Sequence, residues 1–159
     1  MIKDSILELM MRKCIDLATE NITNGQYPIA AIIANKEGNI LAASPSDLRK
    51  NNDPTNHPEI AVIREASEKL QSRFLKGYYL FTTLEPCPMC AAAAVWAKMQ
   101  GIVYGASQED AIEYINMNPI RQFSWRQISI KSREVIENGY PRLELYEGVL
   151  RDECNQLFL

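Results

Sequence analysis

Two cysteines in a C-x-x-C spacing, Cys87 and Cys90, are the first residues of this sequence that could do chemistry. They lie in the stretch FTTLEPCPMCAAAAVWAK, between a β-branched run and an alanine-rich run. Such a pair at a strand-to-helix junction fits a thiol redox centre, a metal site or simple packing. Position does not separate these readings, because thioredoxin-like proteins also place the pair at a helix start. The rest of the chain has to decide.

The chain contains a single histidine, His57, and an acidic residue, Glu59, follows two positions later. A lone histidine is more often a surface or core residue than a ligand. This one stands directly before a predicted helix, as the cysteine pair does. If the two helix starts converge, His57, Cys87 and Cys90 supply one nitrogen and two thiolates, a ligand set that favours Zn²⁺.

The number of available ligands indicates a catalytic rather than a structural zinc ion. A structural zinc ion normally has four protein ligands, and no second C-x-x-C or C-x-x-H supplies a fourth here. Cys14 and Cys154 fall inside predicted amphipathic helices, where packing is the expected role. Three ligands leave one position open for water. Glu59 would then serve as the general acid/base, whereas without a metal it would be a first-turn glutamate that interacts with the helix dipole.

Hydrophobic periodicity predicts the elements that must position these residues. Helices are expected from the capping box at Ser5–Glu8 to Asn24–Gly25, and at 58–70, 90–99, 108–115, 132–138 and 149–158. Strands are expected at 27–35, 40–44, 78–84, 101–107 and 142–148, with the first two forming a hairpin. Strands that alternate with helices after a hairpin indicate an α/β layered domain with a mixed sheet.

Length, composition and charge limit the classes of protein that remain. With 159 residues and 47% hydrophobic residues, the chain predicts one domain over residues 1–159. No apolar stretch is long enough to span a bilayer, and the charged N-terminus is not typical of a secretion signal. Four scattered cysteines suit the reducing cytoplasm rather than a disulfide framework. A net charge of −3 argues against a partner that is mainly phosphate backbone.

The motifs together resemble the zinc-dependent nucleobase and nucleoside deaminases of the cytidine-deaminase-like superfamily, whose signature is H-x-E followed by P-C-x-x-C. Here the two halves read HPE at 57–59 and PCPMC at 86–90. The flanking DPTNHPE and TTLEPCPMC are similar to the branch that holds guanine deaminases and tRNA adenosine deaminases. The stretch LYEGVLRDEC near the end is similar to the tRNA-type members.

The resemblance implies roles for the matching residues. His57, Cys87 and Cys90 would hold Zn²⁺, and Glu59 would move protons. It also implies a three-layer α/β fold with a central five-stranded mixed sheet flanked by helices. Members of the family are commonly homodimers with active sites near the interface.

Two positions depart from the family pattern, and both fall on recognition of the base. Ser46 stands where this branch usually has an asparagine that hydrogen-bonds the base. Pro58 replaces the usual alanine between the histidine and the glutamate, so that this backbone position has no N–H to offer. A loop is expected at residues 116–131, where Phe123 and Trp125 would stack on a flat base from a lid, with burial in the core as the alternative.

The function that these features predict is hydrolytic release of ammonia from an aminated purine-like base or nucleoside, a small-molecule heterocycle, as in guanine deaminases. A tRNA adenosine deaminase is the second hypothesis, and the acidic pI of about 5.3 disfavours it. A pyrimidine deaminase is the third. From other classes, a thiol oxidoreductase and a catalytically silent deaminase-like subunit stay open, although Glu59 argues against the silent subunit.

Overall fold

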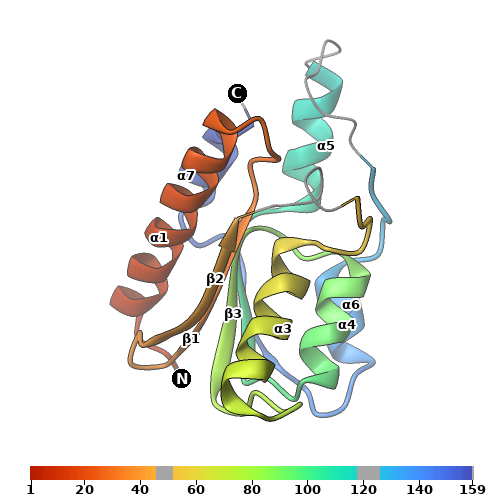
Figure 1. Cartoon of the computed structure of the whole chain (residues 1–159). Helices are drawn as coiled ribbons and strands as arrows, with labels where there is room; N and C mark the ends of the chain where they lie inside the picture. Colours follow the sequence, from red (N-terminus) through yellow and green to blue (C-terminus); the bar gives the residue numbers. More distant parts are fainter. Residues whose placement is uncertain (46–51, 118–125, 159) are drawn as a thin grey trace.

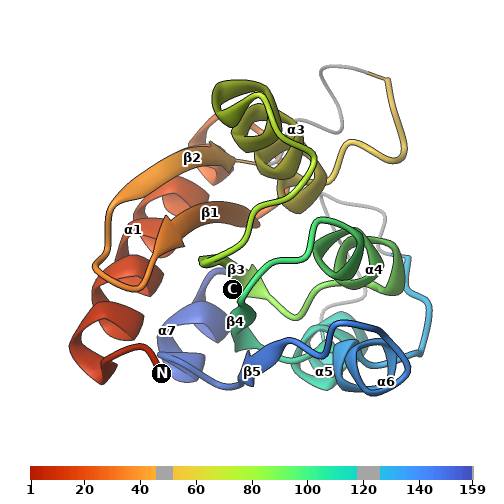
Figure 2. The ribbon, with the colours of Figure 1, turned by 90° about the horizontal axis from the view of Figure 1, so that it is seen from below.

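A mixed five-stranded sheet forms the centre of this computed structural model, which describes residues 1–45, 52–117 and 126–158. The strand order is β2-β1-β3-β4-β5 (Figures 1 and 2). β2 and β3 run antiparallel to β1, whereas β3, β4 and β5 run parallel. The strands are β1 Ala30–Asn35, β2 Ile40–Pro45, β3 Tyr78–Leu84, β4 Gly101–Ala106 and β5 Glu144–Tyr146.

Helices cover both faces of the sheet, which gives the expected three-layer α/β architecture (Figure 1). α1 (Asp4–Thr23) and α7 (Arg151–Gln156) lie against one face. On the other face lie α3 (Pro58–Leu70), α4 (Pro88–Trp96) and α6 (Ser132–Glu137).

Two apolar clusters fill the space between these layers. One contains Met10, Met11 and Phe81 beneath α1, and the other contains Val62, Leu80 and Ile102 beneath α3 and α4. Alternate residues of β3 therefore point into different clusters, as the two-residue period of a strand requires.

The start of the first helix corrects the expectation from sequence. α1 begins at Asp4 with Lys3 as its N-cap, so Ser5 and Glu8 do not form a capping box. Ile2 and Leu7 are both buried in the same cluster, the positions that form a hydrophobic staple around an N-cap at residue 3. Burial of these two side chains decides the helix start. The end of α1 was predicted correctly, since Asn24 is its C-cap and Gly25, with φ 71°, follows that cap.

Several element bounds also differ from the expectation. Residues 116 and 117 belong to α5 (Gln108–Met117) rather than to a loop. The cysteine helix begins at Pro88, before the predicted position 90, and ends at Trp96. The last strand is shorter than predicted because only Glu144–Tyr146 pairs with β4. Among the helices in the described ranges, none combines the length and the apolar character that a bilayer span requires.

Candidate metal centre and active site

Two helix starts present the candidate metal-ligating side chains. His57 is the N-cap of α3 and Cys87 is the N-cap of α4, and a proline opens each helix. Proline is favoured there because its fixed φ suits the first turn and its missing N–H has no helical partner to lose. Figures 1 and 2 show α3 and α4 side by side on the same face of the sheet. Their first turns therefore meet, although 30 positions separate His57 from Cys87.

The three side chains converge on one point. Sγ of Cys87 lies 3.7 Å from Nδ1 of His57 and 3.6 Å from Sγ of Cys90. Sγ of Cys90 lies 3.5 Å from the same Nδ1 atom. Within the described residues this is the one group of three histidine, cysteine or acidic side chains that is arranged to hold a metal ion.

These separations fit a tetrahedral zinc ion. Zinc bonds of about 2.3 Å to sulfur and about 2.0–2.1 Å to nitrogen, opened to the tetrahedral angle, place two sulfurs about 3.8 Å apart and a sulfur and a nitrogen about 3.6 Å apart. The observed distances of 3.5, 3.6 and 3.7 Å lie within about 0.2 Å of these values.

The acid–base properties of the cluster also favour a bound cation. Hydrogen bonding to Cys90 and to His57 lowers the pKa of Cys87 to about 4. The pKa of Cys90 is instead strongly raised by its contact with Cys87, by burial and by the nearby Glu59. Two adjacent thiolates repel each other, and a divalent cation between them removes the penalty for ionising both.

Glu59 is buried in the first turn of α3, with 4% of its surface exposed. Oε1 accepts a hydrogen bond of 2.9 Å from the Oγ1 hydroxyl of Thr82, and Oε2 lies 3.6 Å from Sγ of Cys90. Burial raises the pKa of Glu59, and the neighbouring His57 opposes that shift. A carboxyl group with a raised pKa beside a metal site is suited to accept and return a proton.

A second buried carboxylate, Glu85, supports the turn that carries the cysteines. Oε1 accepts hydrogen bonds from the backbone N–H and the hydroxyl of Ser132, and Oε2 accepts one from the backbone N–H of Gln108. Glu85 therefore joins the starts of α5 and α6 to the residues directly before Cys87.

Sequence reasoning did not single out Thr82 or Glu85. The available signals were a hydroxyl residue near the end of an apolar strand and an acid directly before the Pro-Cys turn. Both signals are weak, because a hydroxyl residue in a strand or an acid before a turn does not indicate which residues its side chain will contact.

Of the residues predicted to contact the substrate, the structure describes Pro58 alone. Pro58 is buried at the first position of α3. Ser46, Phe123 and Trp125 lie outside the described residues, as does most of the predicted lid at 116–131. Their contacts with a base therefore stay predictions. Cys14 and Cys154 are buried in α1 and α7, outside the group formed by His57, Cys87 and Cys90, in agreement with a packing role.

Comparison with known proteins finds a deaminase family that this chain matches. The profile for the cytidine and deoxycytidylate deaminase zinc-binding region matches residues 4–106. Guanine deaminase from Bacillus subtilis is 36% identical over 107 residues, which is 67% of this chain and 68% of that protein. tRNA-specific adenosine deaminase from Haemophilus influenzae is 30% identical over 152 residues, which is 94% of this chain and 79% of that protein.

Two further similarities extend over most of the chain. A tRNA(Ile)-lysidine synthase from Deinococcus deserti is 31% identical over 152 residues. The match covers 96% of this chain but 27% of that protein, so the chain spans about a quarter of that relative's length. A solved structure from a study of A-to-I editing by tRNA:A34 deaminases has a TM-score of 0.75 at 28% identity. It covers 94% of this chain and 98% of the solved one.

Proposed function

The chain belongs to the zinc-dependent hydrolytic deaminases of the cytidine and deoxycytidylate deaminase family, and from this premise we propose that it releases ammonia from an aminated purine-like base or nucleoside. The observation that carries the proposal is the convergence of His57, Cys87 and Cys90 beside the buried carboxyl group of Glu59. One nitrogen and two sulfurs would hold a zinc ion with three protein ligands, the number typical of catalytic sites, and Oε2 of Glu59 lies 3.6 Å from one of them, Sγ of Cys90.

In this proposal the ligands and the proton carrier have separate roles. His57 and the two cysteines would hold the zinc ion, which would supply Lewis-acid chemistry and lower the pKa of water to about 7. Glu59 takes a proton from the attacking water and gives it to a ring nitrogen. A second proton passes through Glu59 to the departing amine, so that a C–NH₂ group and water become a C=O group and ammonia. Burial keeps Glu59 away from bulk solvent.

The substrate proposal rests on the guanine deaminase relative, which matches the region with both motifs. Ser46 and Pro58 offer fewer hydrogen-bonding groups to the base than the Asn and Ala usual in this branch. We therefore expect a specificity different from that of its relatives, within purine-like substrates. The serine-to-asparagine change, Ser46→Asn, should alter the ratio of kcat/KM values between bases. An unchanged ratio would show that Ser46 does not determine specificity.

A tRNA adenosine deaminase is the second candidate, and one observation favours it. The similarity to the Haemophilus influenzae enzyme reaches over 94% of the chain, whereas the match to the guanine deaminase covers 67%. A pyrimidine deaminase is the third candidate.

The discriminating experiment measures ammonia released by the pure zinc-loaded protein. The panel contains guanine, guanosine, adenosine, cytosine, cytidine and unmodified tRNA. Turnover of guanine or guanosine supports the first candidate, and conversion of adenosine to inosine in tRNA supports the second. No activity on any of them, together with dithiol oxidoreductase activity that survives removal of zinc, would overturn the assignment as a deaminase.

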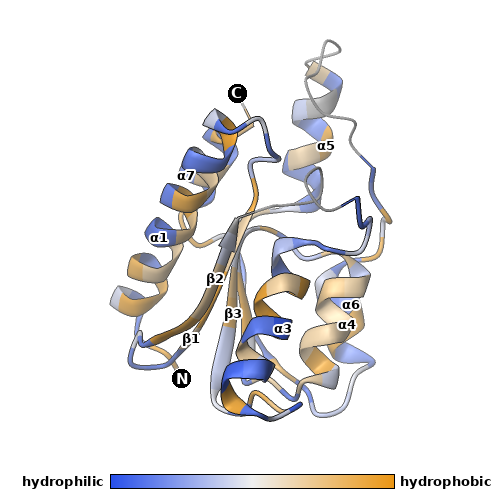
Figure 3. Ribbon diagram, viewed as in Figure 1, coloured by the Kyte–Doolittle hydropathy of each residue, from blue (hydrophilic) through white to orange (hydrophobic). Residues whose placement is uncertain are grey.

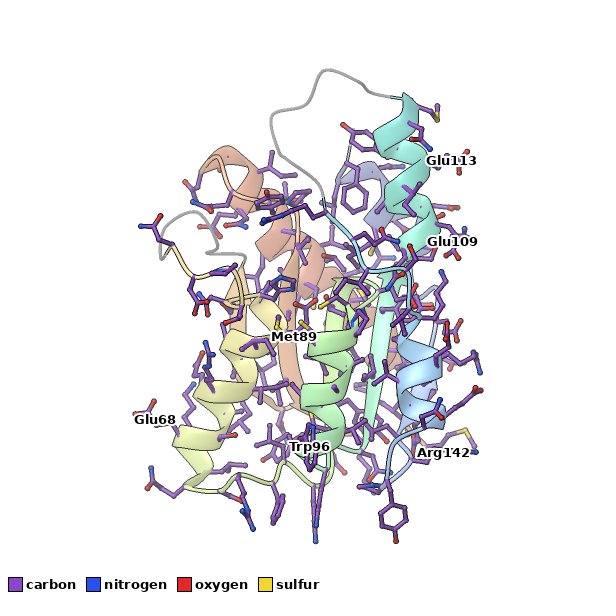
Figure 4. All side chains as sticks on the ribbon, turned by 90° about the vertical axis from the view of Figure 1, so that its right-hand side faces the viewer. Glu68, Met89, Trp96, Glu109, Glu113 and Arg142 are labelled. Carbon is purple, nitrogen blue, oxygen red and sulfur yellow. The ribbon has the colours of Figure 1, made fainter. Side chains whose placement is uncertain are left out.

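We also propose that the protein acts as a homodimer that pairs through α4. The outward face of this helix carries Met89, Ala92, Ala93 and Trp96, which recur at the spacing of one helix face. Trp96 is 82% exposed. Figure 3 shows the apolar character of α4, and Figure 4 labels Met89 and Trp96 near its two ends. An aromatic anchor beside small residues is suited to helix contact with a second copy.

The proposed interface would lie close to the active site, because the cysteines open the same helix. The four cysteines form no disulfide in the structure. Unpaired thiols, two of them proposed as zinc ligands, suit a reducing compartment, and we place the protein in the cytoplasm.

A further inference from the structure

The two carboxylate oxygens of Glu59 lie in different surroundings. Oε1 accepts the hydrogen bond from the Thr82 hydroxyl at 2.9 Å. Oε2 lies 3.6 Å from Sγ of Cys90 and therefore faces the candidate zinc ligands His57, Cys87 and Cys90. The carboxyl group thus has one anchored oxygen and one oxygen at the site where chemistry is proposed.

Thr82 is placed for this contact by the sheet. It lies on β3 with no exposed surface, opposite Ala31 of β1 and Tyr104 of β4. Leu80, two positions earlier on the same face of the strand, belongs to the apolar cluster beneath α3 and α4. A buried hydroxyl without a partner is costly, and within the described part of the chain the recorded partner of Oγ1 is Glu59. The hydroxyl is therefore directed at the carboxyl group of Glu59.

We propose that Thr82 is a positioning residue whose hydrogen bond to Oε1 holds the Glu59 carboxyl group in one orientation, with Oε2 turned towards the candidate zinc ligands. The Thr82 hydroxyl is a stronger donor to Oε1 than the Cys90 thiol is to Oε2, because S–H is a weak donor. Glu59 is therefore held in place before a substrate binds, which is the benefit of a preorganised site. This inference rests on the proposed role of Glu59 in deamination.

The first arm of the test uses the isosteric change Thr82→Val in zinc-loaded protein. The valine keeps the shape and removes the donor. We expect kcat to fall at least tenfold, with KM within twofold of wild type and the zinc content unchanged. Thr82→Ser returns a hydroxyl to the same strand position and should restore most of kcat. A change in kcat without a change in KM is not expected if Thr82 only stabilises the fold.

The second arm does not depend on activity. In protein labelled with ¹³C at the glutamate carboxyl groups, the resonance of Glu59 is identified by its absence from Glu59→Gln. We expect this resonance to shift in Thr82→Val and to return towards the wild-type position in Thr82→Ser. If wild type deaminates nothing, the proposed function fails while this arm still tests the contact.

Thr83 provides a matched control on the same strand. Its hydroxyl is also buried, but it accepts a hydrogen bond of 3.2 Å from the backbone N–H of Ala30, on the opposite face of the sheet. Thr83→Val should lower Tm and leave kcat within twofold of wild type.

Three results would overturn the inference: unchanged kcat in Thr82→Val, an unmoved Glu59 resonance in that variant, or a Thr82→Ser variant as impaired as Thr82→Val. If the valine variant does not fold, Thr82→Ala takes its place under the same criteria.

Discussion

Oε2 of Glu59 lies 3.6 Å from Sγ of Cys90, although 31 positions separate the two residues in the chain. The proposed proton carrier is thus in contact with a proposed metal ligand, at the point where the starts of α3 and α4 meet. Although the two residues are in contact, we expect their substitutions to have separate effects. Removal of the thiolate should cost the metal, and removal of the carboxylate should cost the reaction alone.

We expect one zinc ion per chain, measured by elemental analysis of the pure protein. Cys87→Ala should lose the metal, because two ligands do not hold zinc as three do. Cys14→Ala is the control, since that buried cysteine lies outside the cluster, and it should keep full zinc. Stoichiometric zinc in Cys87→Ala, or its absence from wild type, would contradict the ligand assignment.

Glu59→Gln should keep the fold and the zinc ion and lose most of the activity. Glutamine has nearly the same shape but does not carry a proton between water and the base, and general acid–base catalysis contributes about 10²–10⁴ in rate. The measurement is kcat/KM on the substrate found in the panel. A variant within about threefold of wild type would remove Glu59 from the mechanism.

Trp96→Glu should convert the proposed dimer into a monomer, as measured by light scattering after size-exclusion chromatography. A charge placed in an apolar contact is desolvated without a partner, which weakens association. Ile40→Glu is the control, because Ile40 is 43% exposed at the edge strand β2 and lies outside the α4 face. A wild-type monomer at micromolar concentration, or a Trp96→Glu dimer, would refute pairing through α4.

Trp125→Ala should raise KM with little change in Tm, if this residue stacks on the base from the segment 116–131. Loss of a stacking ring costs binding of a flat base, about 1–3 kcal/mol in related systems. Thermal unfolding and steady-state kinetics on the same preparation distinguish stacking on the base from packing in the core. A large fall in Tm with an unaltered KM would place Trp125 in the core instead.

The ion pair between Asp110 of α5 and Arg151 of α7 should make stability depend on pH. Nε and Nη2 of Arg151 lie 2.9 Å and 2.6 Å from the two oxygens of Asp110. The Arg151 guanidinium holds the pKa of Asp110 below its usual value. The folded state thus binds the proton less well than the unfolded chain, whose aspartate titrates near about 3.9. The stabilisation is present above that pH and is lost as the pH falls through the folded pKa.

The check is Tm of wild type and Asp110→Asn between pH 7 and pH 2.5. The variant should melt about 2–4 °C lower at pH 7, and the difference should close in acid as the wild-type carboxylate is protonated. Asp16→Asn, at an exposed position of α1, is the control without such a difference. A gap that stays constant down to pH 2.5 would show that charge is not its origin.

Much of the fold was predictable because its signals are local. The isoleucine-rich run at β1 and the strand YYLFTTL appear as strands in the structure. The proline that opens α3 and the apolar spacing after it also gave the correct helix, Pro58–Leu70. The start of α1 was missed, since it depends on the burial of Ile2 and Leu7 against the rest of the protein. The short β5 was overestimated because pairing with β4, rather than its own pattern, sets its length.

Residue types and their spacing predicted the candidate chemistry of the site without any knowledge of the fold. The spacing of Cys87 and Cys90 and the HPE motif indicate a zinc ligand set with an acid beside it, because these are statements about residue types a few positions apart. The fold was needed to show that His57 meets the cysteines, and that a threonine 23 positions from Glu59 holds one of its oxygens. Those contacts depend on how the strands pair and on which face of the sheet each helix covers, and that information is spread over the whole chain.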